Sequence, residues 1–190
     1  EEGKGALALA IATADRAGSR LILANDPDAD RLAVAEKQEN GEWRVFNGNE
    51  IAFLLASWIW EDYKKKHTDT SKYGDCVMIA STVSSKILRA MARAEGFSFE
   101  ETLTGFKWIG NKADQVLEAG KTFLFGYEVE IGFLPGDISL DKDGIRTAAV
   151  FAEMAHHLYG KEANYSLGKH LSHLYDKYGW YLMRTRYFFS

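Results

Sequence analysis

The chain has 190 residues, of which 46% are apolar and 13% aromatic, so it can bury the core of one or two globular domains. Its formal net charge of −4 gives no basic field that would favour nucleic-acid binding. The single cysteine, Cys76, excludes an internal disulfide and lies in an apolar run typical of a core strand. No apolar run approaches the length of a membrane span and no signal peptide is visible, so we expect a cytosolic protein.

The first third of the chain predicts a helix, three short strands and a second helix. The Ala-rich start favours a helix that ends at Gly18. Asn40-Gly41 is typical of a tight hairpin turn. Asn49 is expected to cap the second helix, since its side chain can accept a backbone hydrogen bond at a helix start. The expected elements are a helix over 4–18, strands over 21–24, 32–35 and 43–46, and a helix from 47–50 to about 63.

The rest of the chain alternates between strands and helices. Within 145–159 the apolar side chains recur at helical spacing and form one face. The polar stretches 64–75 and 128–144 are expected to be surface connections. This alternation predicts an α/β fold with mixed, largely parallel sheets and flanking helices. The expected strands cover 76–80, 97–103, 122–127 and 180–188, and the expected helices end near residues 95, 119, 159 and 178.

Three aspartates alternate with small or stiff residues between two of the expected strands. Asp26, Asp28 and Asp30 would crowd like charges onto a tight connection, where a hard divalent cation such as Mg²⁺ or Mn²⁺ is the natural compensator. A solvated acidic turn is the alternative interpretation. An EF-hand loop is disfavoured because its sixth and twelfth positions, which need Gly and Glu, hold Arg31 and Lys37. The Arg31 guanidinium suits a pair of phosphate oxygens, which points to phosphoryl chemistry.

Three later loops follow expected strands and carry polar side chains. In α/β folds, ligands collect at the carboxyl ends of the strands. Thr104-Gly105-Phe106-Lys107 offers a hydroxyl, a glycine, an aromatic ring and a cation. In an extended chain Glu128 and Glu130 would face the same side, and Lys142-Asp143-Gly144 adds a cation next to a turn. Together these groups suit a sugar phosphate, whereas each motif alone is typical of an ordinary loop.

Five short motifs follow one another along the chain. They run from Asp-Pro-Asp-Ala-Asp-Arg at 26–31 through Gly-Asn-Glu at 48–50, Thr-Gly-Phe-Lys-Trp at 104–108 and Glu-x-x-Ile-Gly at 128–132 to Lys-Asp-Gly at 142–144. In this order they resemble the motifs of the α-D-phosphohexomutase superfamily. The likeness is greatest to its eukaryotic phosphoglucomutase-2/phosphopentomutase branch, and it covers essentially the whole chain.

The resemblance implies that the chain is an internal fragment of a four-domain enzyme. Residues 1–46 would be the C-terminal part of domain 2 with the metal loop, and residues 47–163 would be domain 3 with the sugar-binding loops. Residues 164–190 would lead into a truncated domain 4. The missing domains 1 and 4 of the same protein would then complete the enzyme.

The resemblance also implies roles for the charged candidates. Asp26, Asp28 and Asp30 would bind Mg²⁺, and Arg31 would lie beside a catalytic phosphoserine. Lys142 would match the lysine that binds or protonates near the substrate phosphate. Arg31 and Lys142 are therefore the expected catalytic residues of this segment.

The remaining loops would bind the sugar. Thr104-Gly105-Phe106-Lys107 would match the loop that senses sugar orientation, and Glu128 and Glu130 would occupy the two sugar-hydroxyl positions. Val129 and Glu130 depart from the family pattern, which usually has Glu followed by Ser or Ala there.

The implied activity is that of an intramolecular phosphotransferase, a phosphoglucomutase/phosphopentomutase that interconverts sugar 1-phosphates with glucose 6-phosphate or pentose 5-phosphates. A phosphoserine would donate its phosphoryl group, and a bisphosphorylated intermediate such as glucose 1,6-bisphosphate would return the other. The family's serine loop does not occur in these residues, so the isolated chain is expected to be inactive. Two alternatives stay open: a glucose 1,6-bisphosphate synthase, and a non-catalytic module that binds Mg²⁺ or a sugar phosphate.

Overall fold

The structure, a computed structural model, describes residues 5–182. Its helices are α1 (Ala8–Ala17), α2 (Gly48–Lys66), α3 (Ile87–Glu95), α4 (Phe106–Glu118), α5 (Gly144–Tyr159) and α6 (Leu167–Tyr178), with the 3-10 helix η1 (Thr70–Asp75). Its strands are β1 (Leu21–Ala24), β2 (Ala33–Lys37), β3 (Trp43–Phe46), β4 (Cys76–Ser81), β5 (Ser98–Thr102), β6 (Thr122–Glu128) and β7 (Gly132–Pro135).

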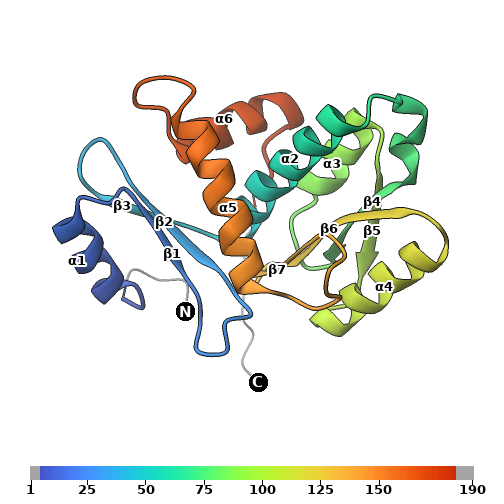
Figure 1. The fold of residues 1–190 in the computed structure, drawn as a ribbon, viewed down its shortest axis with the longest axis horizontal. Helices are drawn as coiled ribbons and strands as arrows, with labels where there is room; N and C mark the ends of the chain where they lie inside the picture. The colour runs from blue at the N-terminus through green and yellow to red at the C-terminus, as the bar shows by residue number, and fades with distance from the viewer. Residues whose placement is uncertain (1–4, 183–190) are drawn as a thin grey trace.

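These strands form two sheets, with helix α5 between them (Figure 1). The first sheet has the order β1-β2-β3 and is antiparallel throughout. The second has the order β5-β4-β6-β7, in which β4 pairs in parallel with β5 and β6, while β7 is antiparallel to β6. The predicted mixed α/β class is confirmed, and the parallel pairs are confined to the second sheet.

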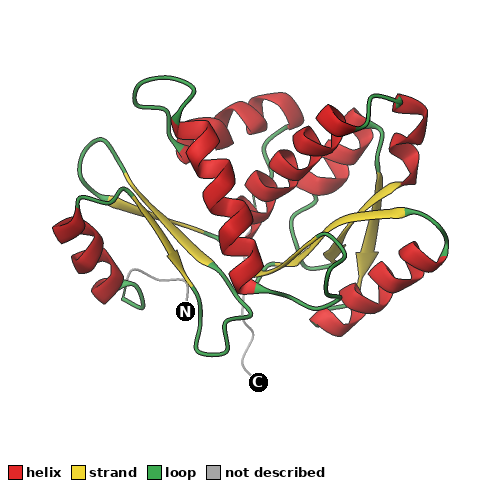
Figure 2. Cartoon of the chain, in the orientation of Figure 1, coloured by secondary structure: helices red, strands yellow, loops and turns green. Residues whose placement is uncertain are grey.

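The second sheet is covered on both faces by helices (Figure 2). Val77 and Ile79 of β4 pack in a small cluster with α4, whereas Met78 and Ala80 point into the main core with α2 and α3. This alternation follows from the two-residue period of a strand. Cys76 is fully buried in the main core, as the sequence predicts.

The N-cap of helix α2 lies two residues before the predicted one. Asn47 is the N-cap: its side chain accepts from the Glu50 backbone N–H while the Glu50 carboxylate accepts from the Asn47 N–H, both at 3.0 Å. The prediction that Asn49 caps this helix is therefore wrong. Asn49 instead joins α2 to its neighbours, because its Oδ1 accepts from the Ser85 N–H at 2.9 Å and the Tyr127 hydroxyl at 3.0 Å.

Several other boundaries differ from the sequence expectation. The connection 128–144 contains the buried strand β7, which the sequence did not predict. Helix α4 begins at Phe106, so part of the predicted loop 104–107 is helical. Residues 180–182 form no strand, and the rest of the predicted strand 180–188 lies outside the described residues. The helix ending at Gly18 and the strands on either side of the aspartates are confirmed.

A buried carboxylate joins the first sheet to the C-terminal helices. Glu36 on β2 is fully buried and accepts hydrogen bonds from the Leu167 N–H at 2.8 Å and the Tyr159 hydroxyl at 3.0 Å. It thereby holds the strand that follows the aspartate loop against α5 and α6. Within residues 5–182, no helix combines the length and apolarity that a bilayer crossing needs.

Candidate metal and sugar-phosphate site

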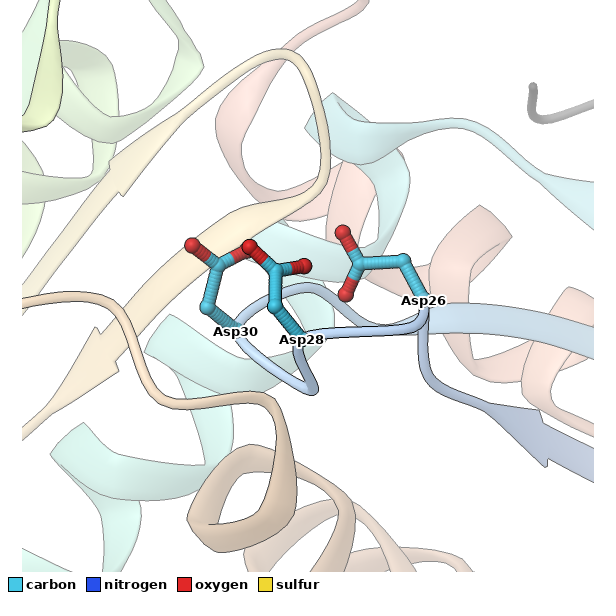
Figure 3. Close-up of side chains that lie close together, drawn as sticks. All are labelled: Asp26, Asp28 and Asp30. Atoms are coloured by element: carbon cyan, nitrogen blue, oxygen red, sulfur yellow. The ribbon is translucent and has the colours of Figure 1, made fainter.

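The three aspartates meet in the loop between β1 and β2. One carboxylate oxygen from each of Asp26, Asp28 and Asp30 lies within 4.8 Å of the other two, and the side chains extend on one side of the loop (Figure 3). This distance suits oxygen ligands around one small cation. The sequence prediction that these residues come together is thus met by the geometry.

Local hydrogen bonds give the loop its shape. The Ala29 N–H donates to the Asp26 carbonyl at 3.0 Å, and the Arg31 N–H donates to Asp26 Oδ1 at 3.1 Å. Asn25 closes the loop, since its Nδ2 donates to the Arg31 carbonyl at 2.6 Å. Ala29 has a φ of 60°, a left-handed turn conformation that brings successive aspartates to the same side.

The loop is held between β7 and the start of α5. The Leu32 N–H donates to the Ile131 carbonyl at 3.1 Å, and the Gly144 N–H donates to the Ala29 carbonyl at 3.1 Å. Gly144 is required by this close approach, because a Cβ there would lie 2.3 Å from the Arg31 carbonyl oxygen. Residues about 100 positions away along the chain therefore fix the loop.

Two cations flank the aspartates. Lys142 Nζ lies 2.7 Å from Asp30 Oδ2, and Arg31 Nε lies 3.7 Å from Asp26 Oδ2 and 3.8 Å from Asp30 Oδ1. Asp30 Oδ1 is buried and has no hydrogen-bond partner among the described residues. Asp28 is exposed and makes no hydrogen bond or ion pair with them. The loop thus keeps carboxylate oxygens available for a further ligand.

Glu128, at the end of β6, adds a fourth carboxylate to this region. Burial and the neighbouring Glu130 raise the pKa of Glu128 above its ordinary value, against the opposing effect of Lys142 and Arg31. Burial alone would lower the pKa of Lys142, but its hydrogen bond and attraction to Asp30 outweigh burial and raise it. These mutual effects show that Glu128, Lys142 and the aspartate loop share one electrostatic environment.

The two glutamates do not lie on an extended chain, contrary to the sequence expectation. Glu128 pairs with Gly132 across a tight β6–β7 connection, and Ile131 between them has a φ of 54°. Glu130 lies at the exposed tip of this connection. Because the chain reverses here, the two-residue alternation of an extended chain, which would place Glu128 and Glu130 on one side, does not apply to them.

The segment Thr104-Gly105-Phe106-Lys107 lies next to Lys142 and combines exposed and buried residues. Thr104, Gly105 and Lys107 are exposed, whereas Phe106 is buried under α4, with Lys142 Nζ 5.8 Å from its ring centre. The expected exposed aromatic face is therefore absent at Phe106, which packs instead. Trp108, in the first turn of α4, is half-exposed and is not among the site residues that the sequence predicts.

The structure thus brings together the aspartates, Arg31, Lys142 and Glu128, with the start of α4 beside Lys142. Asn25 and Gly144 hold the aspartate loop in place, a role that the sequence did not predict. An amide directly before the acidic run was the available signal for Asn25. Nothing local pointed to the contact of Gly144 with the loop.

The chain is similar to several known proteins. The family model described as phosphoglucomutase/phosphomannomutase, alpha/beta/alpha domain III, matches residues 47–178. Phosphopentomutase of Homo sapiens is 54% identical over 188 residues, covering 99% of this chain and 30% of that protein. Glucose 1,6-bisphosphate synthase of Homo sapiens is 50% identical over 188 residues, with the same coverage of 99% and 30%.

A solved structure shows the same fold. The crystal structure of a phosphoglucomutase/phosphomannomutase family protein from Burkholderia thailandensis superposes with a TM-score of 0.65 at 18% identity, covering 90% of this chain and 32% of that chain. The chain spans about 30% of the length of the curated relatives that it matches. Since the family model matches more than half of the chain, the chain belongs to the phosphoglucomutase/phosphomannomutase family.

Proposed function

We propose that this chain supplies the Mg²⁺ site and part of the sugar-binding site of a sugar-phosphate mutase. The observation that carries the proposal is the cluster of Asp26, Asp28 and Asp30 with two cations and a further carboxylate at its edge. Transfer of a phosphoryl group to a sugar needs ligands for a metal ion, cations that bind phosphate and a group that accepts hydrogen bonds from the sugar hydroxyls.

The residues present fit a divalent cation. The donors are all carboxylate oxygens, which hard cations prefer, and Asp30 Oδ1 is buried without a hydrogen-bond donor among the described residues. Arg31 and Lys142 offset two of the three aspartate charges, and Glu128 adds one more negative charge. Two negative charges are thus uncompensated, which matches one Mg²⁺. When bound, Mg²⁺ would neutralise charge on the transferring phosphoryl group.

The neighbouring side chains would bind and orient the substrate. The Arg31 guanidinium, nearly half-exposed, can bind two phosphoryl oxygens, and Lys142 provides a second cation within reach. Glu128 can accept hydrogen bonds from sugar hydroxyls, with Glu130 and the exposed Thr104 and Lys107 at the rim. The proposal for the whole protein also includes a serine nucleophile, which these residues do not supply, and a cytosolic location.

The proposed activity is interconversion of sugar 1-phosphates with sugar 5- or 6-phosphates through a bisphosphate such as glucose 1,6-bisphosphate. The 54% identity to a phosphopentomutase supports a pentose 1-phosphate substrate. A glucose 1,6-bisphosphate synthase is the second candidate, because a relative of that name is 50% identical over the same length. The proposed domain limits are residues 1–46, 47–163 and 164–190.

Assays of the full-length protein would test this function. Ribose 1-phosphate and glucose 1-phosphate should be isomerised in the presence of Mg²⁺ and a catalytic amount of glucose 1,6-bisphosphate. A synthase would instead accumulate the bisphosphate from a separate phosphoryl donor. Absence of both reactions would favour the non-catalytic binding module and contradict the proposal.

The metal assignment has a sharper test. Asp28→Asn removes one ligand without breaking any contact with the described residues, so the fold should persist. Mg²⁺ affinity, measured by calorimetry, should fall by on the order of 10- to 100-fold, with activity falling in parallel. Asp114→Asn, an exposed carboxylate on α4, is the matched control. Equal Mg²⁺ affinity in Asp28→Asn and the control would sink the metal assignment.

A further inference from the structure

A cavity lies at the opposite end of β6 from Glu128, away from the candidate metal site. Its volume is about 710 Å³, and it opens between α2, α5, the start of β6 and the end of β7. Thr122 at the start of β6 lines it, whereas Glu128 lies at the end of that strand, roughly 20 Å further along. None of the candidate metal or sugar residues lines this cavity.

Arg146, in the first turn of α5, lines this cavity, and its side chain has no hydrogen-bond or ion-pair partner among residues 5–182. Its Nη1 is buried and has no hydrogen-bond acceptor, and no carboxylate of the described residues lies within ion-pair distance of the guanidinium. A buried donor without an acceptor destabilises a protein. The guanidinium is nevertheless fixed, because it packs on Gly136, where a Cβ would lie 2.8 Å from Nη2. A positioned and unsatisfied guanidinium indicates a ligand acceptor.

The other walls of the cavity restrict what that ligand can be. Apolar and aromatic surface comes from Trp58, Tyr63, Phe123 and Val150. The charged lining consists of the cations Lys66, Lys72 and Arg146 and the carboxylates of Asp62, Asp75, Asp137 and Glu153. With four carboxylates against three cations, the lining gives no excess of positive charge, which disfavours a bisphosphate or other polyanion. A single carboxylate attached to an apolar body fits both the guanidinium and the walls.

We propose that this cavity binds a small organic monocarboxylate with an aromatic or aliphatic body. The Arg146 guanidinium holds the carboxylate through two N–H donors, and the ligand body packs between Trp58 and Val150. The site is separate from the proposed metal and sugar-phosphate site and does not depend on the proposed activity.

Calorimetry on the full-length protein tests the site with phenylacetate as the probe. We expect saturable one-to-one binding that weakens by about 10- to 100-fold in Arg146→Met, the effect of losing a charge-assisted hydrogen-bonded pair. Arg146→Lys keeps the charge but loses the paired donors, and should weaken binding as well. Arg16→Met, which removes an exposed arginine on α1, should leave binding unchanged.

The melting temperature of Arg146→Met is a second readout, which distinguishes a ligand-binding arginine from one that stabilises the fold. Because Arg146 has no partner in the described part of the chain, Arg146→Met should leave the melting temperature unchanged or raise it. A clear fall in melting temperature would overturn the proposal, since it would show that the guanidinium stabilises the fold. Absence of phenylacetate binding, equal binding to Arg146→Met, or Arg146-dependent binding of inorganic phosphate alone would overturn it too.

Discussion

Gly144→Ala tests whether the start of α5 positions the aspartate loop. The added Cβ would lie 2.3 Å from the Arg31 carbonyl oxygen and 2.7 Å from the Ala29 carbonyl oxygen, both of them backbone atoms of the loop. An ordinary contact begins at 3.4 Å, so the loop must retreat by about 1 Å. Such overpacking destabilises a fold by about 1–3 kcal/mol. The same displacement should move the three aspartates relative to Lys142.

The rate and the Mg²⁺ affinity of Gly144→Ala should fall by more than its loss of stability alone would explain. A displacement of about 1 Å at a reacting centre can lower the rate by on the order of 100-fold. Calorimetric Mg²⁺ titration and initial rates of the full-length protein would measure the effect, with thermal melts as the stability readout. Gly160→Ala, at the other end of α5, is the matched control, because its Cβ would meet only ordinary contacts at 3.6 Å. If Gly144→Ala matched this control in metal affinity and rate, the proposed support of the loop by α5 would be refuted.

Two further substitutions test the contacts that hold the helices. Glu36→Gln should lower the free energy of unfolding in urea by about 1.5–3 kcal/mol, because an amide N–H₂ would face the N–H and O–H donors around this buried position; a loss equal to that of the exposed Glu42→Gln would contradict this. Burial alone would raise the pKa of Glu95, but hydrogen bonds from Lys177, Tyr178, Trp60 and Lys64 outweigh it and lower the pKa to about 2. Because the pKa is lower in the folded state, ionised Glu95 stabilises the fold at pH values above 4.5, the ordinary pKa of the group, and this stabilisation is lost as the pH falls toward 2. Over this pH range the melting temperature should therefore fall more steeply for the wild type than for Glu95→Gln.

The parts of the site that the sequence predicts correctly are local. Asp26, Asp28 and Asp30 come together because one turn between two short strands places them there, and the continuous apolar run on each side reveals both strands. The helices ending near Gly18 and Tyr178 follow from periodicity and capping in the same way. The start of α2 was also readable, since Asn47 and Glu50 have the spacing of a capping box.

The parts that were missed depend on contacts between distant segments. Strand β7 has four residues, all buried, and ends in Pro135, so it shows neither alternation nor length. The left-handed backbone at Ile131 gave no sequence signal, because this conformation is uncommon for a β-branched residue. The Lys142–Asp30 contact joins residues more than 100 positions apart and exists only once α5 and β7 are in place. Tertiary packing, which periodicity does not encode, therefore decides the arrangement of the residues that we propose to bind the sugar.

Among the described residues, two buried side-chain atoms have no hydrogen-bond partner, Asp30 Oδ1 and Arg146 Nη1. A fold that satisfies its other buried polar groups retains such atoms at a free-energy cost, and a ligand that completes them would offset that cost. The Asp30 atom lies in a loop for which the sequence favours a divalent cation over a solvated acidic turn. Arg146 Nη1 belongs to a cation in a cavity with apolar walls, so its missing acceptor supports an anionic ligand there. Both atoms lie close to the first turn of α5 in sequence or by contact, so this turn would support both of the proposed sites, which have opposite charge.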